Sequence, residues 1–285
     1  MSEITLIGLG AMGSAIGRAL IKNKFDLSVW NRSPEPLERM VKLGAKGAAT
    51  LEDAFAASPR IIICVSRYSD ALEILNQPDI IPHLVGKTII QLSTGTPGEV
   101  READQWLRER GAKYLDGSIM VYPVTVGTAA GQLLVSGNED VYKDCEPYIQ
   151  SLGGDVRYVG EKIGAAAALD LAILSRLVVI TPGVIHGARI CESEGVSLEQ
   201  FADMFPEGDR ARSVVLSIHN NEFDKNISAS VNVAVGCISS IKSQAEDLNI
   251  NSEIPDFLLS LYNRAIAAGY RDHDTASLIK VLRDS

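Results

Sequence analysis

A glycine-rich turn near the start of the chain constrains the fold most. Residues 4–13 read Ile-Thr-Leu-Ile-Gly-Leu-Gly-Ala-Met-Gly, a short apolar strand that leads into three glycines and then into a helical pattern. In a dinucleotide-binding turn, the positions of Gly8, Gly10 and Gly13 permit the tight turn, the approach of a pyrophosphate and close helix packing. We predict phosphate contacts from Gly8, Leu9, Gly10, Ala11, Met12 and Gly13. A glycine-rich structural turn is the alternative.

The loop after the second predicted strand, 27–30, bears on the choice of cofactor. An NAD-binding protein places Asp or Glu on the ribose hydroxyl about 20 residues after the glycines. This chain has Asn31, Arg32 and Ser33 there. This segment has no carboxylate that would repel a 2′-phosphate. The guanidinium of Arg32 and the hydroxyl of Ser33 can both bind such a phosphate. We therefore predict NADPH as the cofactor, held in part by these three residues. A solvated arginine in a turn is the alternative.

The first half of the chain alternates apolar strands with helices, which predicts an α/β fold with a Rossmann-type, doubly wound sheet. Further strands are expected at 61–65, 88–92, 113–120, 131–136 and 156–159, and helices at 36–43, 51–57, 70–75, 97–110 and 139–152. Val65 and Thr94 lie where two strands end, at the sheet edge that binds ligands in such folds, so both are candidate cofactor contacts. The turn 93–97 is equally well explained as a helix cap.

A long apolar segment, 163–189, follows the last predicted strand. It opens with four alanines and carries apolar side chains on every face, so we expect a buried helix. At about 1.5 Å per residue it would reach roughly 40 Å, which suits a helix that joins two domains or two subunits, with a kink at Pro182. Polar residues interrupt it before the roughly 18 uninterrupted apolar residues of a membrane span, an alternative that we reject.

One carboxylate, Asp170, lies in the most apolar part of this helix. Burying an unpaired carboxylate costs several kcal/mol, so a partner, a water-lined cleft or a cationic substrate is expected. Arg176 does not share a helix face with Asp170, so an ion pair between them is a poor explanation. We predict that Asp170 is catalytic, with a structural ion pair to another neighbour as the alternative.

Beyond the long helix the strand pattern stops. Helices are expected at 213–220, 230–248, 254–267 and 274–282, and Ser197-x-x-Gln200 reads as a capping box that opens a short helix. The predicted parts are an NADP-binding domain at 1–160, an interdomain helix at 161–190 and an all-helical dimerisation and substrate domain at 191–285.

Composition narrows the class of partner. The formal net charge is −9 without a basic block, which disfavours nucleic acid and anionic membrane and favours a small molecule. The four cysteines and four histidines are scattered, so neither disulfides nor a metal site is expected. The chain enters a strand at once, without a signal peptide, which predicts a cytoplasmic protein.

Taken together, these motifs resemble the β-hydroxyacid dehydrogenase superfamily and, within it, the imine reductases. The resemblance rests on the glycine turn and on segments 31–33, 92–97, 116–120 with Pro123, 164–174 and 268–274. Hydroxyacid dehydrogenases carry a catalytic Lys at the position of Asp170 and an Asn at that of Leu174, whereas imine reductases commonly have Asp or Tyr at the first. Efficient reductive aminases often have Asn at the position of Thr94 and Tyr at that of Val178. Neither residue is present in this chain, so we do not predict that it catalyses amine condensation.

The resemblance implies an NADPH-dependent imine reductase with a C-terminal domain like that of 6-phosphogluconate dehydrogenase. Asp170 would protonate or stabilise the iminium, an attraction of order 4 kcal/mol at about 4 Å. The resemblance also implies a domain-swapped homodimer, which an apolar helix suits. Candidate pocket residues are Met120, Tyr122, Leu174 and Val178. Loop 121–128 would wall this pocket or pack as a buried loop. A hydroxyacid or aldehyde reductase and a non-catalytic NADP-binding module are the rival functions.

Overall fold

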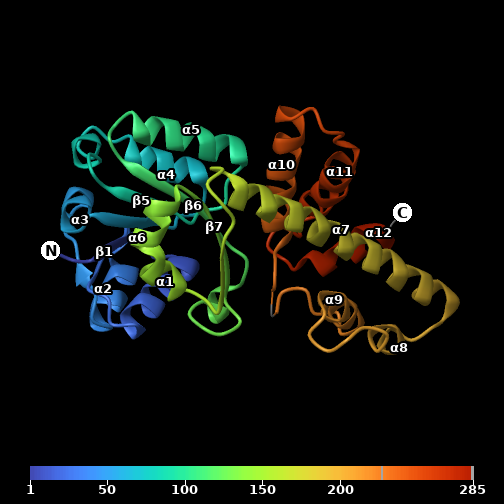
Figure 1. The fold of residues 1–285 in the computed structure, drawn as a ribbon. Helices are drawn as coiled ribbons and strands as arrows, with labels where there is room; N and C mark the ends of the chain where they lie inside the picture. Colours follow the sequence, from blue (N-terminus) through green and yellow to red (C-terminus); the bar gives the residue numbers. More distant parts are fainter. Residues whose placement is uncertain (226, 284–285) are drawn as a thin grey trace. The chain divides into compact units, whose positions relative to one another are not determined.

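The computed structural model describes residues 1–225 and 227–283. The chain divides into two compact units, unit 1 at 1–170 and unit 2 at 171–285 (Figure 1). Unit 1 is α/β and the described part of unit 2 is helical, which confirms the predicted fold class.

Unit 1 is built on an eight-stranded sheet in the order β3-β2-β1-β4-β5-β6-β7-β8. Its strands are β1 (Ile4–Ile7), β2 (Leu27–Trp30), β3 (Lys46–Gly47), β4 (Arg60–Ile63), β5 (Thr88–Gln91), β6 (Lys113–Ile119), β7 (Gln132–Gly137) and β8 (Asp155–Tyr158). The six strands from β3 to β6 in this order are parallel, β7 is antiparallel to β6, and β8 is parallel to β7. Strand β3 was not predicted, because two residues are too few to show alternation.

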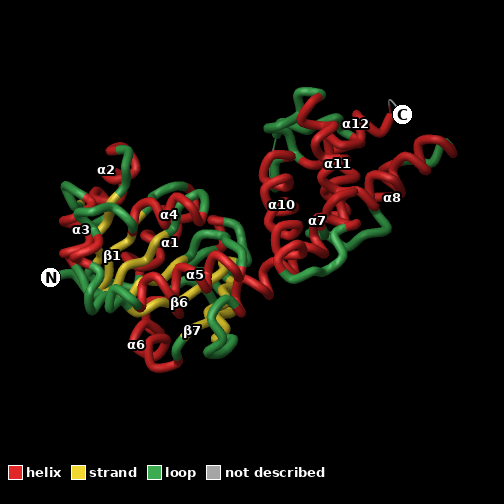
Figure 2. Tube along the Cα trace, turned by 90° about the horizontal axis from the view of Figure 1, so that it is seen from above, coloured by secondary structure: helices red, strands yellow, loops and turns green. Residues whose placement is uncertain are grey.

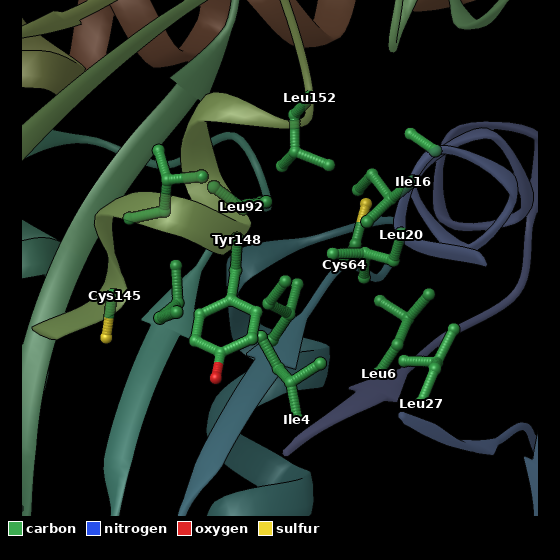
Figure 3. Packing of buried hydrophobic residues seen from close by; sticks show 14 of the residues in the cluster. Ile4, Leu6, Ile16, Leu20, Leu27, Cys64, Leu92, Cys145, Tyr148 and Leu152 are labelled. Atoms are coloured by element: carbon green, nitrogen blue, oxygen red, sulfur yellow. The ribbon is translucent and has the colours of Figure 1, made fainter. Parts of the chain in front are cut away.

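Helices cover both faces of this sheet. One face carries α1 (Ala11–Lys22), α2 (Pro34–Lys42) and α6 (Glu139–Gln150), and the other carries α3 (Leu51–Ala57), α4 (Tyr68–Leu75) and α5 (Pro97–Arg108). Short 3₁₀ turns lie at Ile81–His83 and Pro123–Thr125. Along β1, Ile4 and Leu6 enter the first core and Ile7 the second, because successive side chains of a strand point to opposite faces. Figure 3 shows the first core, where Leu6 of the sheet lies near Leu20 of α1.

The long helix α7 spans Ala165–Glu194 and continues through Pro182. The expectation of a buried helix is wrong for the single chain, because Leu169, Ile173, Leu177 and Val179 are 41–44% exposed. By length and composition α7 is the one described helix that could cross a membrane, with a mean hydropathy of 1.9 over its most apolar 18 residues. Core helices of soluble proteins meet the same criteria.

In unit 2, the later part of α7 packs against further helices through Ile185 and Ala188, and the described residues form no strand (Figure 2). The further helices are α8 (Leu198–Ala202), α9 (Arg210–His219), α10 (Val231–Asp247), α11 (Glu253–Ala267) and α12 (Leu278–Arg283), with a 3₁₀ turn at Thr275–Ser277 before α12. The predicted capping box is wrong. Ser197 Oγ accepts a hydrogen bond from the N–H of Glu199 at 3.1 Å, and Gln200 makes no reciprocal bond. Ser197 is therefore a simple N-cap.

Candidate active site

A row of residues in register crosses the sheet of unit 1. Trp30, Ile7, Ile63, Gln91 and Asp116 pair in that order on β2, β1, β4, β5 and β6. The first four are the last residues of parallel strands, so the segments that follow them lie along one edge. This is the carboxyl edge, where open α/β sheets bind their ligands. The glycine turn, segment 31–33 and the loops after β4 and β5 therefore share one side of unit 1.

The three glycines of the turn differ in their surroundings. Gly8 has a φ of +93°, and a Cβ there would lie 2.2 Å from the carbonyl oxygen of Cys64. A Cβ on Gly13 would lie 1.9 Å from the carbonyl oxygen of Gly8, because α1 starts so close to β1. A Cβ on Gly10 would meet no protein atom within 4 Å. Backbone packing therefore requires Gly8 and Gly13, whereas Gly10 faces open space.

A cavity of about 690 Å³ opens over this turn. The glycine turn, segment 30–33, segment 64–67 and one side of α4 line it. All six residues of the turn, Asn31, Arg32, Ser33 and Val65 are thus brought together. Helix α1 begins here without a side-chain cap, so its first N–H groups are available to an anion.

Asn31 has a more structural place than its neighbours. Its Oδ1 accepts a hydrogen bond from the N–H of Leu9 at 2.8 Å, and its Nδ2 donates one to the carbonyl of Ser33 at 3.0 Å. Asn31 therefore braces the glycine turn against the loop after β2. The side chain of Arg32 is exposed beside the cavity and makes no side-chain hydrogen bond to a described residue.

Several residues of this cavity escaped the sequence analysis. Arg67, Asp70, Glu73 and Gln77 line it, and Arg67 Nη2 lies 2.8 Å from Asp70 Oδ1. Asp70 and Glu73 lie one turn apart on α4, and Gln77 follows two residues after the end of this helix, so all three polar side chains reach the cavity from one side. That spacing, directly after a strand end, was the signal that could have identified them.

Thr94 lies beyond this cavity's lining. It is exposed in the loop after β5, and its neighbour Ser93 accepts a hydrogen bond from the N–H of Val65 at 2.9 Å. The cap of α5 is Thr96, whose hydroxyl accepts a bond from the N–H of Glu99 at 3.2 Å while Glu99 Oε2 accepts one from the N–H of Thr96 at 2.7 Å. A cofactor contact by Thr94 stays a prediction.

The start of α7 is fastened to the sheet by two buried polar side chains. Asp116 Oδ2 accepts hydrogen bonds from the N–H of Ala167 at 3.1 Å and from Ser136 Oγ at 3.3 Å. Ser136 Oγ in turn accepts one from the N–H of Ala166 at 3.1 Å. Burial raises the pKa of Asp116 to about 6. This role of Asp116 was not predicted, because no local sequence feature marks a strand residue that caps a distant helix.

Asp170 follows Ala167 by one helical turn. Asp170 is 8% exposed, and no hydrogen bond or ion pair joins its carboxyl group to a described residue, Arg176 included. Burial raises the pKa of its carboxyl to about 6. A carboxyl group of this kind can exchange a proton near neutral pH.

The candidate substrate residues fall on both units. Met120 is half-buried and Tyr122 is 58% exposed in unit 1, and Leu174 and Val178 are half-buried on the part of α7 in unit 2. A pocket formed by these four residues stays a prediction. Loop 121–128 is not a buried loop at its tip, since Val124 is 85% exposed.

Metal and disulfide chemistry find little support in the described residues. Among the described residues, no disulfide joins Cys64, Cys145, Cys191 and Cys237. Across residues 1–225 and 227–283, no group of three or more His, Cys, Asp or Glu side chains is arranged to hold a metal ion.

Known proteins resemble this chain over almost its whole length. Residues 3–160 match the NAD binding domain of 6-phosphogluconate dehydrogenase, and residues 162–284 match the C-terminal domain of NADPH-dependent reductive aminase-like proteins. An NADPH-dependent reductive aminase of Aspergillus oryzae is 26% identical over 99% of this chain and 97% of its own length. The imine reductase of Myxococcus stipitatus, solved with NADP⁺, is 31% identical with a TM-score of 0.67, over 98% of this chain and 99% of that one. An NAD-dependent L-serine dehydrogenase of Pseudomonas aeruginosa is 24% identical over 99% of this chain and 98% of its own.

Proposed function

We propose that this chain, which belongs to the imine reductase family of the β-hydroxyacid dehydrogenase superfamily, transfers hydride from NADPH to the C=N bond of a cyclic imine or iminium. Family membership makes it an NAD(P)-dependent oxidoreductase. Asp170 carries the finer proposal. It is a buried carboxyl without a partner among the described residues. The family resemblance implies that this is the position where hydroxyacid dehydrogenases carry a catalytic lysine.

The cavity over the glycine turn fits NADPH. Gly10 leaves room for a pyrophosphate, and the first N–H groups of α1 offer donors to its charge. Arg32 and Ser33 would hold the 2′-phosphate on the β2 side, which points the nicotinamide toward Val65 and Thr94 on the β4 and β5 side. When bound, NADPH supplies the hydride.

Asp170 supplies the proton in this mechanism. Because its pKa lies at about 6, a share of its carboxyl groups is neutral near neutral pH. The neutral carboxyl donates its proton to the imine nitrogen as the carbon accepts hydride, which gives the amine. The carboxylate that remains is reprotonated by solvent. A lysine in this place would suit a developing alkoxide instead.

The deciding experiment follows NADPH consumption with a panel of cyclic imines beside a panel of keto acids, and NADP⁺ reduction with hydroxy acids. We expect turnover on imines. Asp170→Ala and Asp170→Asn should each lower it about 10²-fold or more, with little change in NADPH affinity, because loss of a positioned acid typically has this cost. A wild-type enzyme that is inert to imines and active on hydroxy acids would make it a β-hydroxyacid dehydrogenase. NADPH binding without any turnover would make it a binding module.

Cofactor choice has its own test. We expect at least a tenfold preference for NADPH over NADH, about 1.4 kcal/mol. Arg32→Glu should erase or reverse it, since a carboxylate would repel the 2′-phosphate. The matched control is Arg39→Glu, an equal change of charge on an exposed face of α2 that does not line the cavity. Equal affinities of the wild type for both cofactors would refute the assignment.

A further inference from the structure

We propose that Asp116 is a positioning residue for Asp170: it fixes the first turn of α7 from strand β6, and the two carboxyl groups together retain one proton. This inference rests on the proposed role of Asp170 as the proton donor.

The first turn of α7 is held from two directions. The N–H groups of Ala165 and Ala168 bond to the local carbonyls of Lys162 and Gly164, at 3.0 Å each. The two N–H groups between them bond to side chains of the sheet, Ser136 on β7 and Asp116 on β6. A negative charge at a helix N-terminus is also favoured by the helix dipole. Asp116 therefore sets the place and the direction of the first turn of α7, and Asp170 lies on the next turn of the same helix.

The N–H group that Asp116 binds lies about one helical turn before Asp170 along α7, and the charge of Asp170 acts on Asp116. Asp116 contacts the N–H of Ala167, and Asp170 is three residues farther along the same helix, which is one turn. Both are buried, and the charge of Asp170 adds to burial in raising the pKa of Asp116. Two nearby carboxyl groups cannot both ionise readily, so the pair keeps a proton to a higher pH than either group would alone.

No described cation offsets this pair. The ionisable neighbours of Asp116 are Tyr114 on its own strand and Tyr68 of α4, which are hydrogen-bonded to each other. On α5, Asp104 and Glu99 act on these tyrosines, and Asp104 is already paired with Arg108. Among the described residues, no lysine, arginine or histidine bonds to Asp116 or Asp170. The proton is therefore the partner that balances the second carboxylate.

Asp116→Asn tests the pair, because an amide oxygen can still accept from Ala167 while the charge is lost. We expect the alkaline limb of the kcat/KM profile for an imine to shift to lower pH by about half a unit or more, with NADPH affinity unchanged. Ser136→Ala removes the neighbouring anchor without removing a charge. It should lower kcat several-fold while moving the alkaline limb less than Asp116→Asn does. Lowered turnover in Asp116→Asn with an unmoved limb would leave Asp116 a merely structural residue.

A second readout does not depend on turnover. Thermal melts of Asp116→Asn, Asp170→Asn and the double variant form a cycle. At pH 8 the Tm gain of the double variant should be smaller than the sum of the single gains, and at pH 4 the changes should be additive. If the Tm changes are additive at both pH values, the two carboxyl groups are not coupled, whether or not imines are substrates. If Asp116→Asn does not fold, unchanged turnover in Ser136→Ala would still refute the positioning role. If the wild type does not turn over imines, the proposed function is refuted. The thermal melts would then still test whether Asp116 and Asp170 are coupled.

Discussion

At the scale of single residues, the glycines of the cofactor turn serve two different purposes. Gly8 and Gly13 are glycines because backbone atoms lie where a Cβ would be, whereas Gly10 is surrounded by open space at the cavity. The first two maintain the fold, and the third leaves room for a ligand. These purposes can be separated by substitution.

Gly13→Ala should lower the free energy of unfolding by about 1–3 kcal/mol, since the clash is with backbone that cannot turn away. Gly10→Ala should leave the stability of the cofactor-free protein nearly unchanged and weaken NADPH binding tenfold or more, about 1.4 kcal/mol. Urea denaturation and fluorescence titration measure the two effects. Wild-type NADPH affinity in Gly10→Ala would contradict the proposed place of the pyrophosphate.

The buried carboxyl of Asp170 should make the free energy of unfolding depend on pH. Its folded pKa, about 6, lies above the ordinary 3.8, so the folded chain holds a proton that the unfolded chain releases. The protonated Asp170 carboxyl therefore contributes fully to the free energy of unfolding below about pH 4. This contribution is lost as the pH rises through 6, which lowers the free energy of unfolding by roughly 3 kcal/mol for a pKa shift of about two units. Asp170→Asn should therefore gain stability over the wild type as pH rises from 4 to 7. Denaturation at both pH values measures this, and a pH-independent difference would contradict it.

At the scale of elements, two threonines just before helix α5 differ in their surroundings. Thr96 is 7% exposed and forms a reciprocal capping box with Glu99, whereas Thr94, two residues earlier, is exposed and makes no side-chain bond to a described residue. Of the two threonines in the loop after β5, Thr96 caps the helix, and Thr94 is left exposed at the carboxyl edge of the sheet.

Thr96→Ala should destabilise unit 1 by about 1 kcal/mol, the usual cost of a lost N-cap, with NADPH affinity unchanged. Thr94→Ala should do the reverse, with stability kept and the rate of hydride transfer lowered, if Thr94 faces the nicotinamide. Thermal melts and single-turnover kinetics distinguish them. Equal behaviour of the two variants would mean that Thr94 does not contact the cofactor.

At the scale of the whole molecule, α7 leaves apolar side chains exposed that a single chain does not cover. Leu169, Ile173 and Leu177 recur at every fourth residue and are each more than 40% exposed. An exposed apolar row of this kind marks an interaction face. We propose that a second copy of the chain covers it in a homodimer.

Sedimentation at micromolar concentration should therefore give a dimer, and the double variant Ile173→Glu with Leu177→Glu should sediment as a monomer with little imine turnover. Val85→Glu is the control, because Val85 is 72% exposed in a loop of unit 1 and lies far from α7 in sequence. A fully active wild-type monomer would refute the dimer.

The sequence by itself determined the features that depend on local backbone geometry. Apart from the short β3, the strands and helices of unit 1 follow from the period of the apolar residues. The glycine turn follows from spacing, because packing one helix against one strand limits the side chains at fixed positions. The isolated carboxylate of Asp170 was visible for the same reason, since it interrupts an apolar period. What these features have in common is that their cause lies within about twenty residues of chain.

Only the tertiary structure decided which distant polar groups meet. Asp116 and Ala167 are far apart in the chain, and neither is unusual in its own segment. Likewise the polar face of α4 enters the cavity only because β4 lies beside β1 in the sheet. Periodicity records which residues are buried, but a hydrogen bond also depends on the register of strands and the placement of helices. That placement arises from the whole core at once, so the anchor of α7 appears only when the chain is folded.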